Sequence, residues 1–357
     1  MHNKCFKSWK HFRMANRKEI HMSENIDRRG FLKNSLLAGG TALAAMNSFE
    51  EKVLSAEIDS TKKAAPLAAT VSPADIPKGK IKDLEIRRVI CGGNLIGGWA
   101  HSRDLIYVSP LIKAYHTTEK ILETFHLAEK RGINTFLTNP VSNSVINEYR
   151  KAGGKLLWIS DCAAGNIKDS IKGSIDTGAD AVYVQGGICD KMVRDNQMKV
   201  LEDTMSFMKD QLVPCGLGAH SLDTVKKCVE AGFDPDFWVK TLHRDDYWSA
   251  TPEKNRAPFD EISGSKKDHD LNHDNIWCGN AKDTIEFMGK LKKPWIAFKV
   301  LAAGAIHPRN AFQWCFENGA DFVCVGMFDF QIVENTEIAE KALKAVAQKT
   351  RVRPWMA

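Results

Sequence analysis

Two sequence motifs that often assign a function are missing from this chain. Its nine cysteines include no C-x-x-C pair and several lie in apolar runs, so neither a zinc knot nor a disulfide framework is expected. No G-x-G-x-x-G follows the first predicted strand, which argues against a doubly wound dinucleotide-binding sheet. The chain after its N-terminal region is not strongly basic either. Much of the formal net charge of +6 falls in the first 33 residues, so no nucleic-acid-binding surface is indicated.

No apolar run near the N-terminus reaches the roughly 20 residues that a membrane-spanning helix needs. Instead, the motif DRRGFLK at 27–33 precedes the mildly apolar segment LLAGGTALAAM. Paired arginines before a weak apolar region are similar to a twin-arginine export signal, with Arg28 and Arg29 as the pair. We therefore expect a signal region over residues 1–56, export by the twin-arginine machinery, and a periplasmic protein. The alternative is a soluble basic tail.

Residues 57–80 are rich in Ala, Pro, Lys and Thr, a composition typical of a linker. Met22 lies just before the arginine motif, so a start there instead of at Met1 is one option. Export by this route carries folded proteins, which fits a chain that keeps unpaired cysteines.

From residue 85 onwards, short apolar runs alternate with amphipathic segments. The runs are continuous, which is typical of parallel strands covered on both faces, and the segments between them have helical periodicity. Thr117 is expected to cap the first of these helices, which Gly132 ends. The expected strands are 85–93, 133–140, 156–161, 181–187, 214–220, 236–243, 295–302 and 322–328.

Eight strand–helix units over about 270 residues match the count and length of a (β/α)8 TIM barrel. We predict a single α/β domain of this type over residues 81–350. An open, doubly wound sheet is the alternative fold.

In a barrel of this type, the active site lies at the carboxyl ends of the strands. Imidazole and carboxylate suit Zn²⁺ or Mn²⁺, so Asp161, His220 and His243 are candidate ligands of a divalent metal ion. The candidate catalytic residues are Lys299, Asp161, His220 and Lys240. The alternative for each is a hydrogen-bonded residue at the rim of the barrel without a catalytic role.

Lys299 interrupts an otherwise apolar run, so its amine should either reach the rim or be paired. A desolvated lysine has a lowered pKa and can act as a base or as a Schiff-base nucleophile. The alternative is an ion pair with Asp161 or Asp329. We expect the amine to point into the mouth of the barrel, near Asp161 or His220, because an outward lysine would be desolvated among helix side chains.

Gly326 ends the last predicted strand and would allow backbone amides to face an anion. The loops after strands seven and eight bind phosphate in many barrels. Gly326 and Met327 are therefore candidate residues for binding a cofactor or another anion. Steric relief at a turn is the alternative explanation of the glycine.

A long polar insertion over residues 243–280 has little apolar periodicity. Loops of this length in a compact domain often form lids over a site. Its aromatic residues Tyr247, Trp248 and Trp277 would suit stacking on the faces of sugars. The alternative is that they only pack the insertion onto the barrel.

Four segments carry a resemblance to a known family: RRVICGGNLIGG (87–98), TTEKILETFHLAEKRGINTFLT (117–138), KPWIAFKVLAAG (293–304) and GADFVCVGMFDFQIVENTEIA (319–339). In this order they resemble the opening strand, first helix and second strand, seventh strand and closing segment of the aldo/keto reductase superfamily. The resemblance spans about residues 85–345 and supports the barrel.

The resemblance also implies a carbonyl-reductase site, with an Asp ending strand two, a nearby Tyr, a Lys ending strand three and a His ending strand four. The matching positions here hold Thr138, no Tyr in the following loop, Ser160 or Asp161, and Gln185. Without the Tyr proton donor and its Lys partner, that mechanism has no acid. The resemblance therefore supports the fold and argues against that activity and against NAD(P) as cofactor.

Together these patterns favour an exported enzyme with lyase, isomerase or epimerase chemistry on a small sugar, polyol or carbonyl compound. Its charged residues would either hold a metal ion or serve as acid and base. One alternative is an NAD(P)-dependent oxidoreductase with a rebuilt site. The other is an exported binding protein without catalytic activity.

Overall fold

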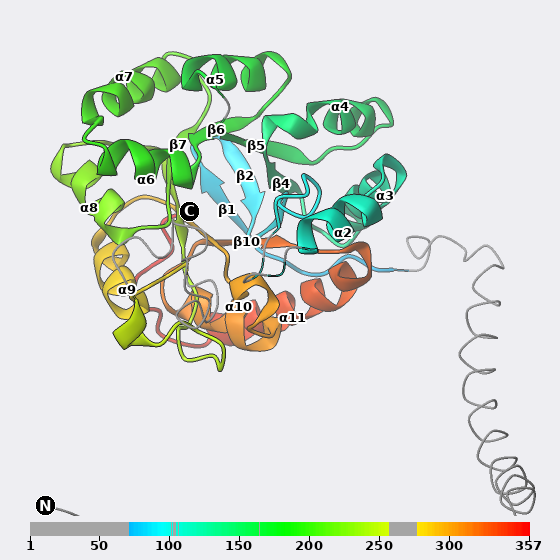
Figure 1. The fold of residues 1–357 in the computed structure, drawn as a ribbon. Coiled ribbons are helices and arrows are strands. Elements are labelled where there is room, and N and C mark those ends of the chain that lie inside the picture. Colours follow the sequence, from blue (N-terminus) through cyan, green and yellow to red (C-terminus); the bar gives the residue numbers. More distant parts are fainter. Residues whose placement is uncertain (1–70, 101, 103–104, 106, 164, 257–276) are drawn as a thin grey trace, which may run out of the picture. The chain divides into compact units, whose positions relative to one another are not determined.

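The computed structural model describes residues 71–357, except 101, 103–104, 106, 164 and 257–276. In this part of the chain, eight parallel strands close into a barrel in the order β10-β3-β4-β5-β6-β7-β8-β9, and helices surround it (Figure 1). The predicted TIM barrel is confirmed. No helix of the described part is both long and apolar enough to cross a bilayer. The predicted signal region lies outside the described residues.

The barrel strands are short and almost entirely buried, as continuous apolar runs require. They are β3 (Val89–Gly92), β4 (Thr135–Thr138), β5 (Leu157–Cys162), β6 (Ala181–Val184), β7 (Cys215–Ala219), β8 (Phe237–Thr241), β9 (Trp295–Phe298) and β10 (Phe322–Gly326). An antiparallel hairpin of β1 (Lys78–Ile81) and β2 (Leu84–Arg87) precedes them.

Each helix buries one stripe against the barrel. The helices are α2 (Val108–Tyr115), α3 (Thr118–Lys130), α4 (Asn143–Lys151), α5 (Ile167–Asp176), α6 (Gly186–Arg194), α7 (Met198–Lys209), α8 (Leu222–Glu230), α9 (Ala281–Lys290), α10 (Pro308–Glu317) and α11 (Asp329–Ala347). The predicted cap of α3 is confirmed, because the Thr117 side chain accepts the backbone N–H of Lys120 at 3.3 Å. Gly132 follows the helix with φ +86°, a conformation that suits glycine.

The hairpin closes the amino end of the barrel. Its residues Ile81 and Ile86 belong to the apolar cluster that fills the barrel interior, together with Phe237 and Phe322 from the first positions of β8 and β10. Figure 1 shows β1 and β2 in the middle of the ring of helices. Because the amino end is filled with apolar side chains, polar chemistry is left to the carboxyl end.

A repeated contact ties the strands together in pairs at the amino end. The residue immediately before each of β4, β6, β8 and β10 accepts, through a side-chain oxygen, a backbone N–H at or near the start of the preceding barrel strand; in the first contact this N–H belongs to Arg87, the last residue of β2, just before β3. The four contacts are Asn134 with Arg87 (2.7 Å), Asp180 with Trp158 (2.7 Å), Asp236 with Cys215 (2.8 Å) and Asp321 with Trp295 (2.9 Å). We call these four contacts the amino-end clamps.

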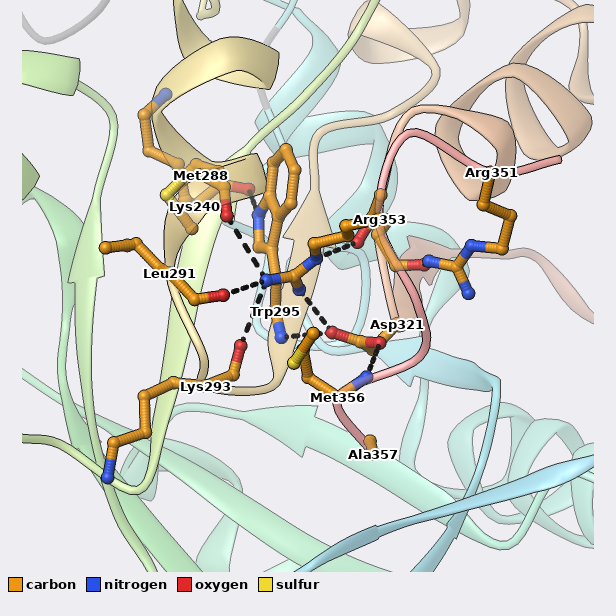
Figure 2. A network of polar contacts seen from close by, with 12 residues as sticks. Lys240, Met288, Leu291, Lys293, Trp295, Asp321, Arg351, Arg353, Met356 and Ala357 are labelled. Atoms are coloured by element: carbon orange, nitrogen blue, oxygen red, sulfur yellow. Dashed lines mark hydrogen bonds and ion pairs between the residues drawn. The ribbon is translucent and has the colours of Figure 1, made fainter.

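The last clamp also holds the C-terminal segment (Figure 2). Arg353 is buried and pairs with the Asp321 carboxylate, and it donates to the backbone carbonyls of Leu291 at 2.8 Å and Met288 at 3.2 Å. The other carboxylate oxygen of Asp321 accepts the backbone N–H of Met356 at 2.8 Å. Residues 351–357 are therefore part of the barrel's amino end and not a loose tail.

Several segments differ from their predicted bounds. The predicted strand 85–93 divides at Arg88 into β2 and β3, because the first half pairs with the hairpin and the second with the barrel. The segment predicted as a linker over 57–80 includes the first residues of β1, and residues 57–70 lie outside the described part. Helix α2 and helix α6 were not expected.

Candidate active site at the carboxyl ends of the barrel strands

Asp161 lies near the end of β5 on the inner face of the barrel. Ile159, two residues earlier, belongs to the interior cluster, and alternate residues of a strand share a face. In the described part of the chain, Oδ1 of Asp161 is buried without a hydrogen-bond partner. Burial raises the pKa of the Asp161 carboxyl to about 7, against a smaller opposite effect of hydrogen bonding from Asn139. A carboxyl group of this kind can hold and release a proton near neutral pH.

His220 follows β7 directly, and its ring is held on three sides. Asp190 of α6 lies 3.0 Å from Nδ1 through its Oδ2 atom, which also accepts the backbone N–H of His220 at 2.8 Å. A Cβ atom on Gly186 would lie 3.1 Å from two atoms of the ring, so the glycine makes room for it. Phe298 approaches edge-on, with the ring centroids 5.1 Å apart. No hydrogen bond to Nε2 is found among the described residues.

Lys299 lies one residue beyond β9, and not within the strand as the apolar run suggested. Its φ of 56° is left-handed, so the chain leaves the sheet at this residue. Its amine lies over the Trp277 ring, 4.7 Å from the centroid. Burial lowers the pKa of Lys299 to about 8. Its positive charge also lowers the pKa of His220, so the two side chains are within electrostatic range of each other.

The turn that begins at Lys299 contains an unusual run of left-handed residues. Ala302, Ala303 and Gly304 follow with φ of 45°, 54° and 91°. Left-handed conformations cost residues with a Cβ atom about 1–2 kcal/mol each. Strain of this kind is concentrated at functional sites. Two alanines in this conformation at a strand's carboxyl end therefore mark this turn as a place where geometry is constrained.

Lys240 is placed behind the site and not in it. Its neighbours Trp238 and Leu242 pack in the core between the sheet and the helices, so Lys240 shares their face. Its amine donates to the Thr241 hydroxyl at 2.6 Å, and that hydroxyl donates to the backbone carbonyl of His220 at 3.1 Å. The Lys240 side chain is 1% exposed and supports the His220 backbone from behind, and a catalytic role for it stays a prediction.

His243 does not serve as a metal ligand, because both ring nitrogens are engaged. Nδ1 donates to the Arg244 carbonyl at 2.7 Å, and Nε2 accepts the backbone N–H groups of Trp277 and Cys278 at 3.2 and 3.1 Å. Burial lowers the pKa of His243 to about 4. The predicted triad with Asp161 and His220 is corrected accordingly, and no group of three His, Cys, Asp or Glu in the described part is arranged to hold a metal.

His243 instead joins the two ends of the long insertion. Its ring contacts Tyr247 and Trp277 edge-on, with centroids 5.8 and 6.1 Å apart. Trp277 is 4% exposed and Trp248 is 85% exposed. Two of the three predicted stacking aromatics therefore pack the insertion onto the barrel. Residues 257–276 of the predicted lid lie outside the described part.

The predicted cofactor residues at the end of β10 differ from each other. Gly326 is exposed, and a Cβ atom there would contact Leu95 at 3.3 Å. Met327 is 1% exposed and belongs to the core between sheet and helices, so its side chain is not available to a ligand. The Met327 side chain packs in the core, and the binding of a cofactor or another anion at Gly326 and Met327 stays a prediction.

The residues at the positions of a reductase site make local contacts. Thr138 is paired with Ser142 at 3.2 Å, and the Ser160 hydroxyl donates to Ser174 at 2.9 Å in the buried core. Gln185 accepts the Ile188 N–H at 3.1 Å and so caps α6. These three side chains are engaged in folding contacts.

Asp190 is the residue that the sequence did not reveal. It lies in α6, which the sequence assigned to the end of a strand and its loop, thirty positions before the histidine that it contacts. A signal existed in the run GGICDKMVR, where an acid occurs one turn after a pair of glycines and next to apolar positions. Only the packing of α6 against β7 identifies its partner.

The fold and these side chains define a (β/α)8 barrel with titratable groups at the carboxyl ends of β5, β7 and β9. No protein-family model matches the sequence, and no curated protein matches it. Several solved structures are similar to this chain. A Pseudomonas aeruginosa protein named as a candidate aldo-keto reductase is 17% identical, with a TM-score of 0.47, and the match covers 74% of this chain and 95% of that one.

Two other similar structures differ in their named activity. An aldo-keto reductase from a deep-sea metagenome library of the Medee basin is 11% identical, with a TM-score of 0.40 and coverage of 65% of this chain and 88% of that chain. A candidate lactate oxidase from Pediococcus acidilactici is 12% identical, with a TM-score of 0.44 and coverage of 79% and 76%. The likeness at these identities is one of fold, and the barrel itself follows from the strand pairing.

Proposed function

We propose that this protein is an acid–base enzyme that moves a proton next to a carbonyl group of a small hydroxy or oxo compound, as isomerases, epimerases and many lyases do. The observation that carries the proposal is His220, a histidine at a strand's carboxyl end with Nδ1 engaged and Nε2 left to a ligand. Lys299 and Asp161 support it, because each titrates closer to neutral pH than usual.

The proposed step assigns one role to each side chain. Nε2 of His220 removes a proton from the carbon beside the carbonyl, and the electron pair of that C–H bond moves into an enolate. The ammonium group of Lys299 stabilises the charge that develops on the enolate oxygen. The neutral carboxyl of Asp161 returns a proton, either to the oxygen or to the carbon. Among the described residues no hydrogen bond or ion pair joins Asp161 to His220, so the substrate would lie between them.

Deuterium exchange tests this proposal directly. The protein is incubated in D2O with a panel of small aldoses, ketoses, hydroxyketones and 2-oxo acids, and loss of the C–H signal beside the carbonyl is followed by NMR. We expect exchange with at least one class, slowed by about 100-fold or more in His220→Gln. The matched control is His126→Gln, which replaces an exposed histidine on α3. Equal exchange by wild type and His220→Gln would refute the role of His220.

The second candidate is an NAD(P)-dependent oxidoreductase, because two of the similar structures are named as aldo-keto reductases. The local contacts of Thr138, Ser160 and Gln185 argue against it. We expect no NADPH-dependent reduction of generic aldehydes and no quenching of protein fluorescence by NADPH. A measurable rate abolished by Lys299→Ala would replace the first proposal with this one. Ligand binding without either reaction would identify a binding protein.

Export to the periplasm by the twin-arginine machinery is proposed on the arginine motif alone. Arg28→Lys together with Arg29→Lys should keep the protein in the cytoplasm, because the pair is the part that the export receptor reads. The measurement is immunoblotting of periplasmic and cytoplasmic fractions. Unchanged periplasmic recovery of the double variant would exclude this route.

A further inference from the structure

We propose that Asp190 is a positioning residue of this site, which holds the proton on Nδ1 of His220 so that Nε2 presents its lone pair to the substrate. The inference rests on the proposed role of His220 as the base. It adds a residue that touches no substrate and acts through the histidine ring.

The carboxylate of Asp190 is surrounded by donors. It is 0% exposed, and its Oδ2 atom accepts the backbone N–H of His220 at 2.8 Å while Oδ1 accepts that of Ser221 at 3.3 Å. A backbone N–H can only donate, so both oxygens act as acceptors. The ring nitrogen Nδ1, 3.0 Å from Oδ2, is therefore the donor of the third hydrogen bond. A neutral imidazole with its proton on Nδ1 has its lone pair on Nε2.

The ring cannot easily leave this orientation. The absence of a side chain at Gly186 creates the space that the ring fills, and Phe298 closes the other side at an interplanar angle of 66°. Turning the ring over would place a carbon atom against Asp190 and lose the hydrogen bond. Because Gly186 and Asp190 both belong to the first turns of α6, one helix sets the position and the tautomer of His220.

The charges around the ring explain why a carboxylate is needed there. Burial lowers the pKa of His220 most, and the charges of Lys299, beyond β9, and Lys240, on β8, lower it further. Asp190 of α6 acts in the opposite direction. Without Asp190 the imidazole would be a weaker base, in an environment that already disfavours the imidazolium that proton transfer creates.

Nitrogen NMR of the ring provides a test that needs no substrate. Long-range ¹H–¹⁵N correlation of ¹⁵N-labelled full-length protein distinguishes a protonated Nδ1 from a protonated Nε2, and comparison with His220→Gln assigns the signal. We expect His220 to be protonated on Nδ1 in the wild type. Asp190→Asn, which keeps the volume, should produce a substantial population protonated on Nε2. A wild-type ring protonated on Nε2 would overturn the inference even if Asp190→Asn does not fold.

The matched control is Asp236→Asn. Asp236 also accepts a backbone N–H, that of Cys215 at the opposite end of the same strand β7, but it contacts no histidine. This variant should leave the ring signals of His220 unchanged, so the loss of a carboxylate that holds the backbone of β7 would be separated from the loss of the one that faces the ring. Equal tautomer changes in both variants would reduce Asp190 to a structural residue and refute the inference.

Deuterium exchange then separates the two proposals. Asp190→Asn should reduce the exchange rate by about 100-fold or more, as loss of the correct tautomer does in other histidine bases. If His220→Gln stops exchange but Asp190→Asn leaves it unchanged, the inference about Asp190 fails and the proposed function stands. If neither substitution affects exchange, the proposed function fails, and the positioning role of Asp190 with it.

Discussion

At the scale of single residues, the carboxyl end of the barrel holds three groups whose protonation differs from that in water. Asp161, Lys299 and His220 are each desolvated, and burial is the first cause of each shift. Burial favours the neutral form of all three, because it raises the pKa of Asp161 and lowers the pKa of Lys299 and of His220. A site of this kind can accept and return protons without a large change in solvation.

Asp161 gives the first prediction. Its pKa is 3.8 when exposed and about 7 in the fold, so the folded state retains a proton that the unfolded state releases in between. Its contribution to the free energy of unfolding therefore falls as pH rises from about 4 to about 7. Asp161→Asn removes this loss. We expect the variant to gain on the order of 1 kcal/mol or more over wild type between pH 4 and pH 8, measured by urea unfolding. The exposed Asp176→Asn should show no such gain.

A substitution of Lys299 is predicted to reduce the reaction rate far more than the stability of the fold. Methionine matches the volume of the lysine stem and removes the amine, so Lys299→Met should keep the fold and change the free energy of unfolding by at most about 2 kcal/mol. The exchange rate in D2O should fall by about 100-fold or more, because the charge that stabilises the enolate is lost. A variant with full exchange would show that the amine is not part of the chemistry.

At the scale of elements, His243 joins the end of β8 to the segment that precedes α9. Its Nε2 atom holds the backbone of Trp277 and Cys278, and Trp277 in turn lies over the Lys299 amine. His243 thus joins the start of the long insertion to its end. This arrangement positions the Trp277 ring beside the amine of Lys299.

The lowered pKa of His243 predicts that this residue's contribution to stability is lost as pH falls, whereas the contribution of Asp161 is lost as pH rises. The pKa of His243 is lowered from 6.5 to about 4, so its contribution to stability is full above about pH 6.5 and is lost as pH falls to 4. His243→Leu leaves two buried N–H groups without an acceptor, which costs about 1–3 kcal/mol each. His243→Gln keeps an acceptor and should lose less. Unfolding of both variants at pH 5 and pH 7.5 should show a smaller pH dependence than wild type. Unchanged dependence would contradict this role.

At the scale of the whole molecule, the two ends of the barrel hold different kinds of contact. The amino end is closed by the hairpin, the clamps and the C-terminal segment, and the carboxyl end holds the titratable groups. Stability and chemistry are therefore separated along the barrel axis, which allows the carboxyl end to keep strained and desolvated residues.

The buried pair of Asp321 and Arg353 gives the prediction for this scale. Both side chains are at most 2% exposed, and breaking a buried pair leaves an uncompensated charge. Asp321→Asn should cost about 3–5 kcal/mol in chemical unfolding. Asp176→Asn, which breaks the exposed pair with Lys172, should cost about 1 kcal/mol or less. A loss below about 1 kcal/mol for Asp321→Asn would mean that the C-terminal segment is not needed for the barrel.

The sequence predicted the barrel because its strands are continuous apolar runs with helical segments between them, a pattern that depends on neighbouring residues. The prediction was wrong where contacts between residues that are distant in the sequence determine the structure. The run at 295–302 ends at Phe298 because the chain turns at Lys299. The hairpin alternates exposed and buried residues from Lys78 to Ile81, a pattern that the charged composition concealed. Asp190 and His220 meet only through the packing of α6, and His243 is occupied by residues that lie more than thirty positions later.

The amino-end clamps recur with a period of two strands, and this has a consequence for how the chain could be divided. The clamps follow the pairs β3–β4, β5–β6, β7–β8 and β9–β10, the first through Arg87 just before β3, and none crosses from one pair to the next. Leu212, exposed and with φ of 62°, lies between α7 and β7, midway along this series. A polypeptide cut there would leave two pairs on each fragment with all clamps intact, so the two halves are natural candidates for reassembly from separately expressed chains. The barrel is thus organised as a tandem array of four similar modules.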